Sequence, residues 1–548
     1  MRSFIFLLLF VSSLNAQPVN KYFIRFTDKN NSNFSVNNPS GFLSPRAIER
    51  REKANIPVDE SDIPVNSSYI DSVKLQGAVV YTTSKWFNGA TIECDTIVLN
   101  AVRSLPFVLS VSKVFRLGPP RIHKNTESGI PFIGQSILKS TGINEGFGNS
   151  FNQIHLMNGE FLHENGFKGE GIQIAVIDDG FFSVNSFTVF EKLRNENRIL
   201  ATYDFVSNET SVYEDDSHGM SVLSTIAGYV PGQLIGTAPQ ASFYLLRSED
   251  AGSENIIEEY NWNAAAEFAD SAGADVITSS LGYTEFDDAS TNHVYTDMDG
   301  DHCPSSIAAD FAASKGMLVL TSAGNSGSSA WHYIGAPSDG DRVISVGAVD
   351  SIGRRASFTS YGPASDGDVK PNLVAKGVKC TLANASGGIS TGNGTSFACP
   401  ILSGAAACIW QRYTMKTNME IKDAIERSAS LYLTPNDSFG YGIPDFRIAS
   451  YFLSSENGEF PATDEIVGVY PNPFSEAIHV RFYASTSEAA VVELFDQLGQ
   501  LISRSEKQVK GGYLNTIDIN YGIPTAKGIY FLRILADDKS HVKLVVQE

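Results

Sequence analysis

Between about residues 151 and 455, short and almost wholly apolar runs alternate with stretches of helical character. This pattern restricts the fold more than any other feature of the sequence. The runs include residues 172–177, 318–320 and 343–346. A strand that is apolar on both faces must be covered on both faces, as in a parallel sheet between helices. The sequence therefore predicts an α/β domain with a mostly parallel sheet.

Four polar residues stand at the borders of these runs. Asp178 directly follows one run and Asn325 follows another, while His218 opens a predicted helix. Ser396 stands in the turn Gly394-Thr395-Ser396, ahead of a predicted buried helix over residues 399–410. Because the carboxyl ends of parallel strands meet at one edge of the sheet, we expect all four residues to converge there.

Each of these residues alone has a plainer explanation as a turn or cap residue. Together they form a hydrolytic set, in which a carboxylate orients an imidazole and the imidazole takes a proton from the Ser396 hydroxyl. The Asn325 amide and the Ser396 N–H, at a helix start, are then donors to an oxyanion. Pro400 is expected in the first helical turn, where a missing N–H matters least.

The order Asp, His, Asn, Ser resembles the subtilisin-like serine proteases over about residues 150–450. The matching motifs are Ala175-Val176-Ile177-Asp178, His218-Gly219, Ser280-Leu281-Gly282, Ser322-Ala323-Gly324-Asn325 and Gly394-Thr395-Ser396. The resemblance implies a three-layer αβα fold, a catalytic triad of Asp178, His218 and Ser396, and Asn325 in the oxyanion hole. It also implies peptide hydrolysis through an acyl-enzyme, without a cofactor.

The same resemblance implies which segments hold the substrate, by pairing with its backbone as an added strand. These substrate-binding residues are Ser280, Leu281, Gly282, Ser322, Ala323 and Gly324.

Four positions depart from the family pattern. Asp179, Ser217, Met220 and Phe397 stand where Thr, Gly, Thr and Met are usual. None of these changes removes a reacting atom. Asp179 is expected to alter the electric field at His218, in a direction that the sequence leaves open.

The chain begins with segments of a different character. Residues 1–16 combine Arg2, an apolar run and small residues up to Ala16, which predicts a secretory signal peptide, with a signal anchor as the alternative. Residues 17–120 alternate β-type runs with a charged helix candidate over residues 45–53, typical of a small α+β domain. Residues 121–150 are a predicted linker. In the resembled family, a domain at this place is a propeptide that assists folding and inhibits the enzyme.

The peptidase-like segment, residues 151–455, is followed by a predicted linker, residues 456–465, and by residues 466–548, which predict a small β-sandwich. Tyr470-Pro471-Asn472-Pro473 and Gly528-Ile529-Tyr530 resemble the sorting domain of type IX secretion cargo in the Bacteroidota. The resemblance implies export, outer-membrane translocation and a secreted or cell-surface location. A sandwich that binds substrate or carbohydrate is the alternative.

Charge and hydropathy exclude several partners. A net charge of −20 argues against nucleic acid and anionic membranes. After the signal peptide, no stretch is long and apolar enough to span a bilayer. The five cysteines are an odd number, so a Cys303–Cys380 pair and buried free thiols both stay open.

One acidic segment is a weak candidate for structural Ca²⁺. Asp297, Asp299 and Asp301 offer the hard oxygen ligands that this ion prefers. The segment lacks the length and the terminal Glu of an EF-hand loop, which favours an acidic surface turn. No Cys/His spacing suits zinc.

The sequence as a whole predicts a secreted serine endopeptidase made as a self-inhibited zymogen. Its expected partners are protein or peptide substrates and the type IX secretion machinery. A non-catalytic surface adhesion protein on the same scaffold is the alternative.

Overall fold

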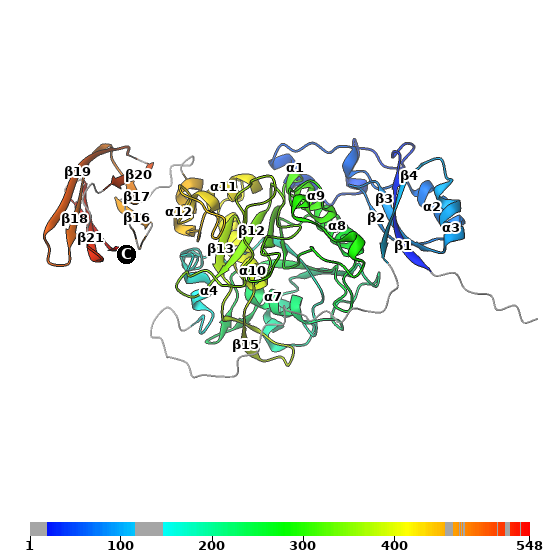
Figure 1. Cartoon of the computed structure of the whole chain (residues 1–548), viewed down its shortest axis with the longest axis horizontal. Helices are drawn as coiled ribbons and strands as arrows, with labels where there is room; N and C mark the ends of the chain where they lie inside the picture. Colours follow the sequence, from blue (N-terminus) through cyan, green and yellow to red (C-terminus); the bar gives the residue numbers. More distant parts are fainter. Residues whose placement is uncertain are drawn as a thin grey trace, which may run out of the picture.

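The structure, a computed structural model, describes residues 19–115, 146–454, 464–470, 472, 474, 477–511, 513–520, 526–536 and 539–547. Three bodies follow one another along the chain, an N-terminal α+β domain, a large central α/β domain and a C-terminal β domain (Figure 1). The predicted signal peptide and most of both predicted linkers lie outside the described residues.

The central domain is built on seven parallel strands in the order β13-β12-β11-β10-β5-β9-β6. Their bounds are β5 (Gln173–Asp178), β6 (Ile199–Asp204), β9 (Ser242–Arg247), β10 (Val276–Ser279), β11 (Leu318–Ser322), β12 (Ile344–Val349) and β13 (Leu373–Lys376). Strands β10, β11 and β12 are buried at every residue, which explains their apolar sequences without alternation. The predicted parallel sheet is confirmed.

Helices cover both faces of this sheet. Ile174 and Val176 of β5 belong to one apolar core with α7 (His218–Ala227) and α10 (Thr395–Arg412). Ala175 and Ile177 point to the other face and belong to a second core with α8 (Ile257–Ala272) and α9 (Pro304–Ser314). The predicted three-layer αβα arrangement is therefore confirmed.

Shorter elements complete the central domain. The helices are α4 (Phe151–His155), α5 (Glu160–Glu164), α6 (Glu191–Asn195), α11 (Asn418–Ser428) and α12 (Phe446–Ser454). The hairpin strands are β7 (Tyr229–Val230), β8 (Leu234–Ile235), β14 (Cys380–Ala383) and β15 (Ile389–Gly392).

The N-terminal domain is a four-stranded antiparallel sheet with helices, as predicted. Its strands are β1 (Asn20–Phe26), β2 (Val79–Ser84), β3 (Gly89–Cys94) and β4 (Val108–Phe115), in the order β2-β3-β1-β4. Helices α2 (Ser67–Leu75) and α3 (Thr96–Arg103) share a core with one face of the sheet. Helix α1 (Pro45–Lys53), at the predicted bounds, lies against α8 and α9 of the central domain (Figure 1).

The C-terminal domain is the predicted β-sandwich. One sheet has the order β16-β17-β20 and the other β19-β18-β21-β22. The bounds are β16 (Glu465–Tyr470), β17 (Ala477–Ala484), β18 (Glu488–Asp496), β19 (Leu501–Val509), β20 (Tyr513–Asn520), β21 (Gly528–Ala536) and β22 (Lys539–Gln547). Phe482 from the first sheet and Leu532 from the second meet in one core.

All five cysteines are buried free thiols, so that interpretation is confirmed and a Cys303–Cys380 pair is not formed. Within the described part of the chain, no helix combines the length and the hydropathy needed to cross a membrane.

Candidate active site

The four polar residues singled out in the sequence lie together at the carboxyl edge of the central sheet. Asp178 is the last residue of β5, and Asn325 follows the end of β11. His218 is the first residue of α7, and Ser396 is the second residue of α10. Asp178 contacts His218, Ser280 contacts Ser396, and Asn325 contacts Thr395, the residue before Ser396.

A buried carboxylate holds the imidazole. Asp178 is fully buried, and its Oδ1 atom lies 2.7 Å from Nδ1 of His218. The imidazole is 26% exposed. A carboxylate at Nδ1 fixes the proton on that nitrogen, so Nε2 becomes the basic atom of a neutral ring.

Ser396 lies in the first turn of α10, where backbone N–H groups have no acceptor within the helix. Its Oγ atom lies 3.5 Å from the carbonyl oxygen of Ser280. The ring of the next residue, Phe397, has its centroid 6.0 Å from that of His218. The first turn of α10 thus lies close to the imidazole through Phe397, and Ser396 stands at the positive end of a long helix.

The expectation for Pro400 is wrong. Helix α10 begins at Thr395 rather than near residue 399, because Gly394 and two small residues enter it directly, so Pro400 lies in the second turn. Its missing N–H is the one that would bond the carbonyl of Ser396. The hydroxyl of Ser280 donates to that carbonyl instead, at 2.9 Å. The sequence did not reveal this role of Ser280.

The amide of Asn325 is oriented by Thr395. Both the N–H and the hydroxyl of Thr395 donate to Asn325 Oδ1, at 2.9 and 3.0 Å. With its oxygen fixed on this side, the side chain directs Nδ2 away from Thr395. The adjacent Gly324 has φ +103°, a left-handed conformation in which a Cβ atom would lie 3.0 Å from Ser360 Oγ.

The two predicted substrate segments follow neighbouring strands. Residues 280–282 follow β10. Ser322 is the last residue of β11, its partner in the sheet, and residues 323–324 follow that strand. Ser280, Ser322 and Ala323 are buried, whereas Gly282 is exposed and Leu281 and Gly324 are half-buried. Backbone pairing with a peptide at these segments stays a prediction.

Two acidic residues near the site, Asp179 and Glu249, have perturbed pKa values. Burial raises the pKa of Asp179 well above its ordinary value, and the negative charge of Asp178 adds to this effect. Burial also raises the pKa of Glu249 to about 8. Glu249 accepts a hydrogen bond from the Tyr283 hydroxyl, and the adjacent Ser248 N–H donates to the carbonyl of Asp178 at 3.0 Å.

The structure does not bring the calcium candidates together. Asp297 caps the Val294 N–H at 2.9 Å, and Asp299 pairs with His302 at 2.6 Å. Within the described ranges, four groups of three carboxylate, imidazole or thiol side chains have ligand atoms within 4.8 Å of one another. Asp297, Asp299 and Asp301 belong to none of these groups. The side chains of these three residues therefore do not form a ligand group of this kind, and a shared Ca²⁺ ion at this segment stays a prediction.

One group of potential metal ligands is buried behind the sheet. Glu259, His293 and Cys303 have donor atoms within 4.8 Å of one another. Glu259 Oε2 lies 2.9 Å from His293 Nε2, and Oε1 accepts from the N–H and hydroxyl of Ser305. These hydrogen bonds account for the Glu259 carboxylate as a cap of α9 without a metal ion.

Comparison with known proteins agrees with this geometry. A model of the subtilase family matches residues 169–442, and models of a Bacteroidota peptidase S8 propeptide domain and a secretion system C-terminal sorting domain match residues 21–128 and 468–548. Subtilisin NAT of Bacillus subtilis subsp. natto is 32% identical over 293 residues, which are 53% of this chain and 68% of that protein. Subtilisin of Bacillus pumilus is 31% identical over 293 residues, 53% of this chain and 94% of that protein. The chain therefore belongs to the subtilase family, as a subtilisin-like serine endopeptidase with a propeptide domain and a C-terminal sorting domain.

Proposed function

We propose that this endopeptidase is exported as a self-inhibited zymogen and cleaves peptide bonds through an acyl-enzyme on Ser396. His218 Nε2 takes the proton from Ser396 Oγ, which attacks the peptide carbonyl and forms a C–O bond. The imidazolium then gives its proton to the leaving amine as the C–N bond breaks. Water hydrolyses the acyl-enzyme by the same proton transfers in reverse.

The surrounding groups stabilise charge during these steps. Asp178 holds the His218 tautomer and stabilises the imidazolium. Asn325 Nδ2 and the Ser396 N–H donate to the oxyanion of the tetrahedral intermediate. The observation that carries the proposal is the buried 2.7 Å contact of Asp178 with His218, beside the first turn of α10. Recognition of the substrate backbone by residues 280–282 and 322–324 implies broad sequence tolerance.

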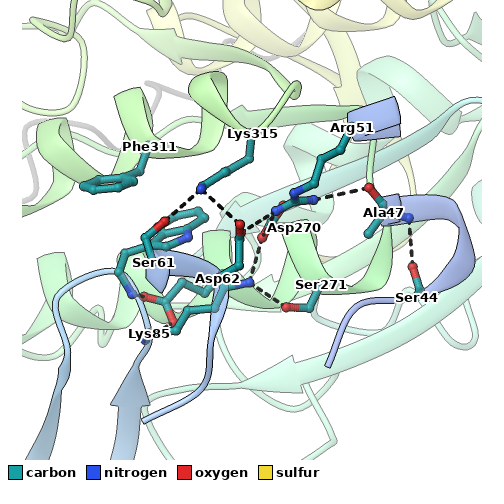
Figure 2. A network of polar contacts seen from close by, with 12 residues as sticks. Ser44, Ala47, Arg51, Ser61, Asp62, Lys85, Asp270, Ser271, Phe311 and Lys315 are labelled. Carbon is teal, nitrogen blue, oxygen red and sulfur yellow. Dashed lines mark hydrogen bonds and ion pairs between the residues drawn. The ribbon is translucent and has the colours of Figure 1, made fainter. Parts of the chain in front are cut away.

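The zymogen part of the proposal is supported by a buried polar contact between the N-terminal and central domains (Figure 2). Asp270 of α8 is fully buried, and its carboxylate binds Arg50 at 2.6 Å, Arg51 at 2.8 Å and Lys85 at 2.7 Å. Burial alone raises the pKa of Asp270, but these three cations of the N-terminal domain outweigh it and hold the pKa well below its ordinary value. One carboxylate of the central domain is thus neutralised by the propeptide domain.

Arg50 also caps the carboxyl ends of helices α8 and α9. The Arg50 guanidinium donates to the carbonyls of Asp270 and Ala274 and, at 3.1 Å, of Lys315, at the carboxyl ends of α8 and α9. Positive charge is favourable there because the last carbonyls of a helix lack partners. Lys315 in turn donates to Ser61 at 2.7 Å and Asp62 at 3.2 Å (Figure 2).

An aromatic contact lies beside the polar one. Phe23 of β1 stacks on Tyr260 of α8 with ring centroids 4.3 Å apart, and Val114 of β4 is buried with Ile257. An N-terminal domain joined by both apolar and charged contacts is expected to remain bound after the connecting segment is cut. This retention would delay activity until the domain is released or degraded.

Catalysis is tested with the full chain and its Ser396→Ala and His218→Ala variants. We expect the wild type to hydrolyse casein and to react with a serine-directed fluorophosphonate, and both variants to lose labelling. A folded wild type without hydrolysis or labelling would favour the adhesion protein.

Processing and export are tested by intact mass and N-terminal sequencing of material secreted by the native host. We expect loss of residues before about 117, within the predicted connector, and of the sorting domain after about residue 466. Recovery of the full chain from the medium would contradict both cleavages.

A further inference from the structure

In the described part of the chain, one of the two carboxylate oxygens of Asp178 lacks a hydrogen-bond donor. Asp178 Oδ1 accepts from His218 Nδ1 at 2.7 Å and from the Asp179 N–H at 3.0 Å. Oδ2 is buried and has no hydrogen-bond partner among the residues that the structure describes. An ionised carboxylate with one buried oxygen left bare is costly, because charge raises the penalty for an unmade hydrogen bond.

The carboxyl group of Asp179 is the nearest acidic neighbour. Three atoms lie within 4.8 Å of one another here: a carboxylate oxygen of Asp178, a carboxylate oxygen of Asp179 and a ring nitrogen of His218. Asp179 Oδ1 accepts from the Gly219 N–H at 3.1 Å, which ties this carboxyl group to the start of α7. Each of two carboxylates this close raises the pKa of the other, unless a cation nearby compensates their charge.

The charges around Asp179 do not supply that cation. Burial and Asp178 raise the pKa of Asp179, Asp216 raises it further, and His218 lowers it. Arg247 of β9 reaches only the backbone carbonyl of Asp179, at 2.8 Å, because its guanidinium pairs with Asp204 at 2.7 Å and Asp215 at 3.3 Å. Beyond β9, Glu249 supplies no cation either, since it is a carboxyl group whose pKa burial raises to about 8.

We propose that Asp179 is a positioning residue whose carboxyl group is protonated in the resting enzyme and donates its O–H to the bare Oδ2 of Asp178. The two carboxyl groups then carry one negative charge between them, located on Asp178. That charge holds the imidazole at Oδ1 while the Asp179 proton satisfies Oδ2. The inference rests on the function proposed above. It also addresses the effect of Asp179 on His218 that the sequence left open, since a neutral Asp179 adds no net charge near the imidazole.

The test compares Asp179→Asn with the wild type through the acid limb of kcat/KM, which reports the imidazole pKa of the free enzyme. If Asp179 is already neutral, D179N removes no charge and the acid-limb midpoint stays where it is. If Asp179 is ionised, D179N removes a negative charge close to the imidazole and lowers the midpoint by about one pH unit or more, which would overturn the proposal.

Two further variants test the donor. D179A leaves Oδ2 bare at every pH, and we expect kcat to fall about tenfold or more. D179N and D179S keep a neutral donor and should lose less than D179A. Equal losses in all three variants would mean that Asp179 makes no hydrogen bond to Asp178, and this too would overturn the proposal.

A readout without activity separates this inference from the proposed function. In the full chain carrying Ser396→Ala, the low-field proton resonance of His218 Nδ1 is titrated with and without D179N. Equal midpoints support a neutral Asp179, and a lower midpoint in D179N refutes it. If the wild type shows no activity that depends on Ser396, the proposed function fails while this titration still locates the proton.

Discussion

The hydroxyl of Ser280 donates a 2.9 Å hydrogen bond to the backbone carbonyl of Ser396, the acceptor that Pro400 leaves without an N–H. The helix that carries Ser396 is therefore completed by a residue that directly follows strand β10. This hydrogen bond joins the predicted substrate-binding edge to the first turn of α10. It gives the serine a fixed position despite a proline in the second turn.

Replacing Ser280 by Ala removes this donor and leaves a buried carbonyl unsatisfied. We expect the free energy of unfolding to fall by about 1–3 kcal/mol. The measurement is the urea midpoint in a Ser396→Ala background, which prevents self-cleavage.

Ser403→Ala is the matched control for this prediction. Its hydroxyl donates at 2.8 Å to the Cys399 carbonyl, which also has the helical N–H of Ser403 as partner. Its removal should cost less than that of Ser280. A larger loss in the control would mean that the Ser396 carbonyl finds another donor.

Asn325→Leu removes the side-chain donor to the oxyanion and should reduce kcat with little change in KM. In a subtilisin such a loss is about 10²–10³-fold, and we expect the same range. The check is steady-state kinetics on a chromogenic peptide. Thr395→Val, which removes one of two hydrogen bonds to Asn325 Oδ1 and keeps the other, should cost much less. Equal losses would show that Asn325 acts only through its contact with Thr395.

Asp270→Asn should weaken the binding of the N-terminal domain after cleavage, because Arg50, Arg51 and Lys85 lose the charge they share. Of the three, Arg51 still pairs with Asp62, at 2.8 Å. Breaking a buried ion pair on one side costs about 3–5 kcal/mol. We expect a shorter lag before full activity and separation of the two fragments at lower salt on size-exclusion chromatography.

Asp275→Asn is the control for the docking contact. Its partner Arg46 has a side chain 37% exposed, and a pair of this kind contributes less than about 1 kcal/mol. The lag should change little in this variant. Equal lags for wild type and Asp270→Asn would indicate that apolar contacts such as Phe23 with Tyr260 hold the domain alone.

Glu249 should make the protein less stable as pH rises. Burial raises its folded-state pKa from 4.5 to about 8, so the folded state keeps a proton that the unfolded state has lost. The stability from this proton is fully present below about pH 4.5 and declines up to about pH 8, by about 1.4 kcal/mol per pH unit for one proton.

Glu249→Gln should flatten that decline in urea midpoints measured between pH 5 and 8 on the Ser396→Ala background. The neutral amide keeps the contact with the Tyr283 hydroxyl and cannot ionise. An unchanged slope would mean that Glu249 is ionised in the folded protein at neutral pH.

Much of the fold was predictable because buried strands and exposed helices differ in the hydropathy of consecutive residues. The apolar run at residues 172–177 predicted β5, and the charged stretch at residues 45–53 predicted α1 at its observed bounds. The position of Pro400 was not predictable, because it depends on where α10 begins. The helix begins at the small residues after Gly394, and the pattern of apolar residues does not indicate that starting point.

Some residues of the candidate site were likewise predictable from the sequence, and others were not. Asp178, His218, Asn325 and Ser396 were predicted because each follows a strand or opens a helix, and parallel strands bring such positions to one edge. The contributions of Ser280 and Thr395 were missed, since a hydroxyl gives no sign of which carbonyl or amide it will bond. The calcium site stays a prediction. The carboxylate of Asp297 accepts from the Val294 N–H, and that of Asp299 accepts from the Asp301 N–H and contacts His302.

The sequence by itself determined the order of layers and the residues at the sheet edge. Both depend on hydropathy and on the ends of strands, which are properties of residues close together in the chain. Only the tertiary structure decided which donor replaces the N–H missing at Pro400, and that Asp270 meets Lys85 from 185 residues away. The physical reason is that a polar group is satisfied by whichever partner the fold brings within about 3 Å, and sequence separation does not limit that choice.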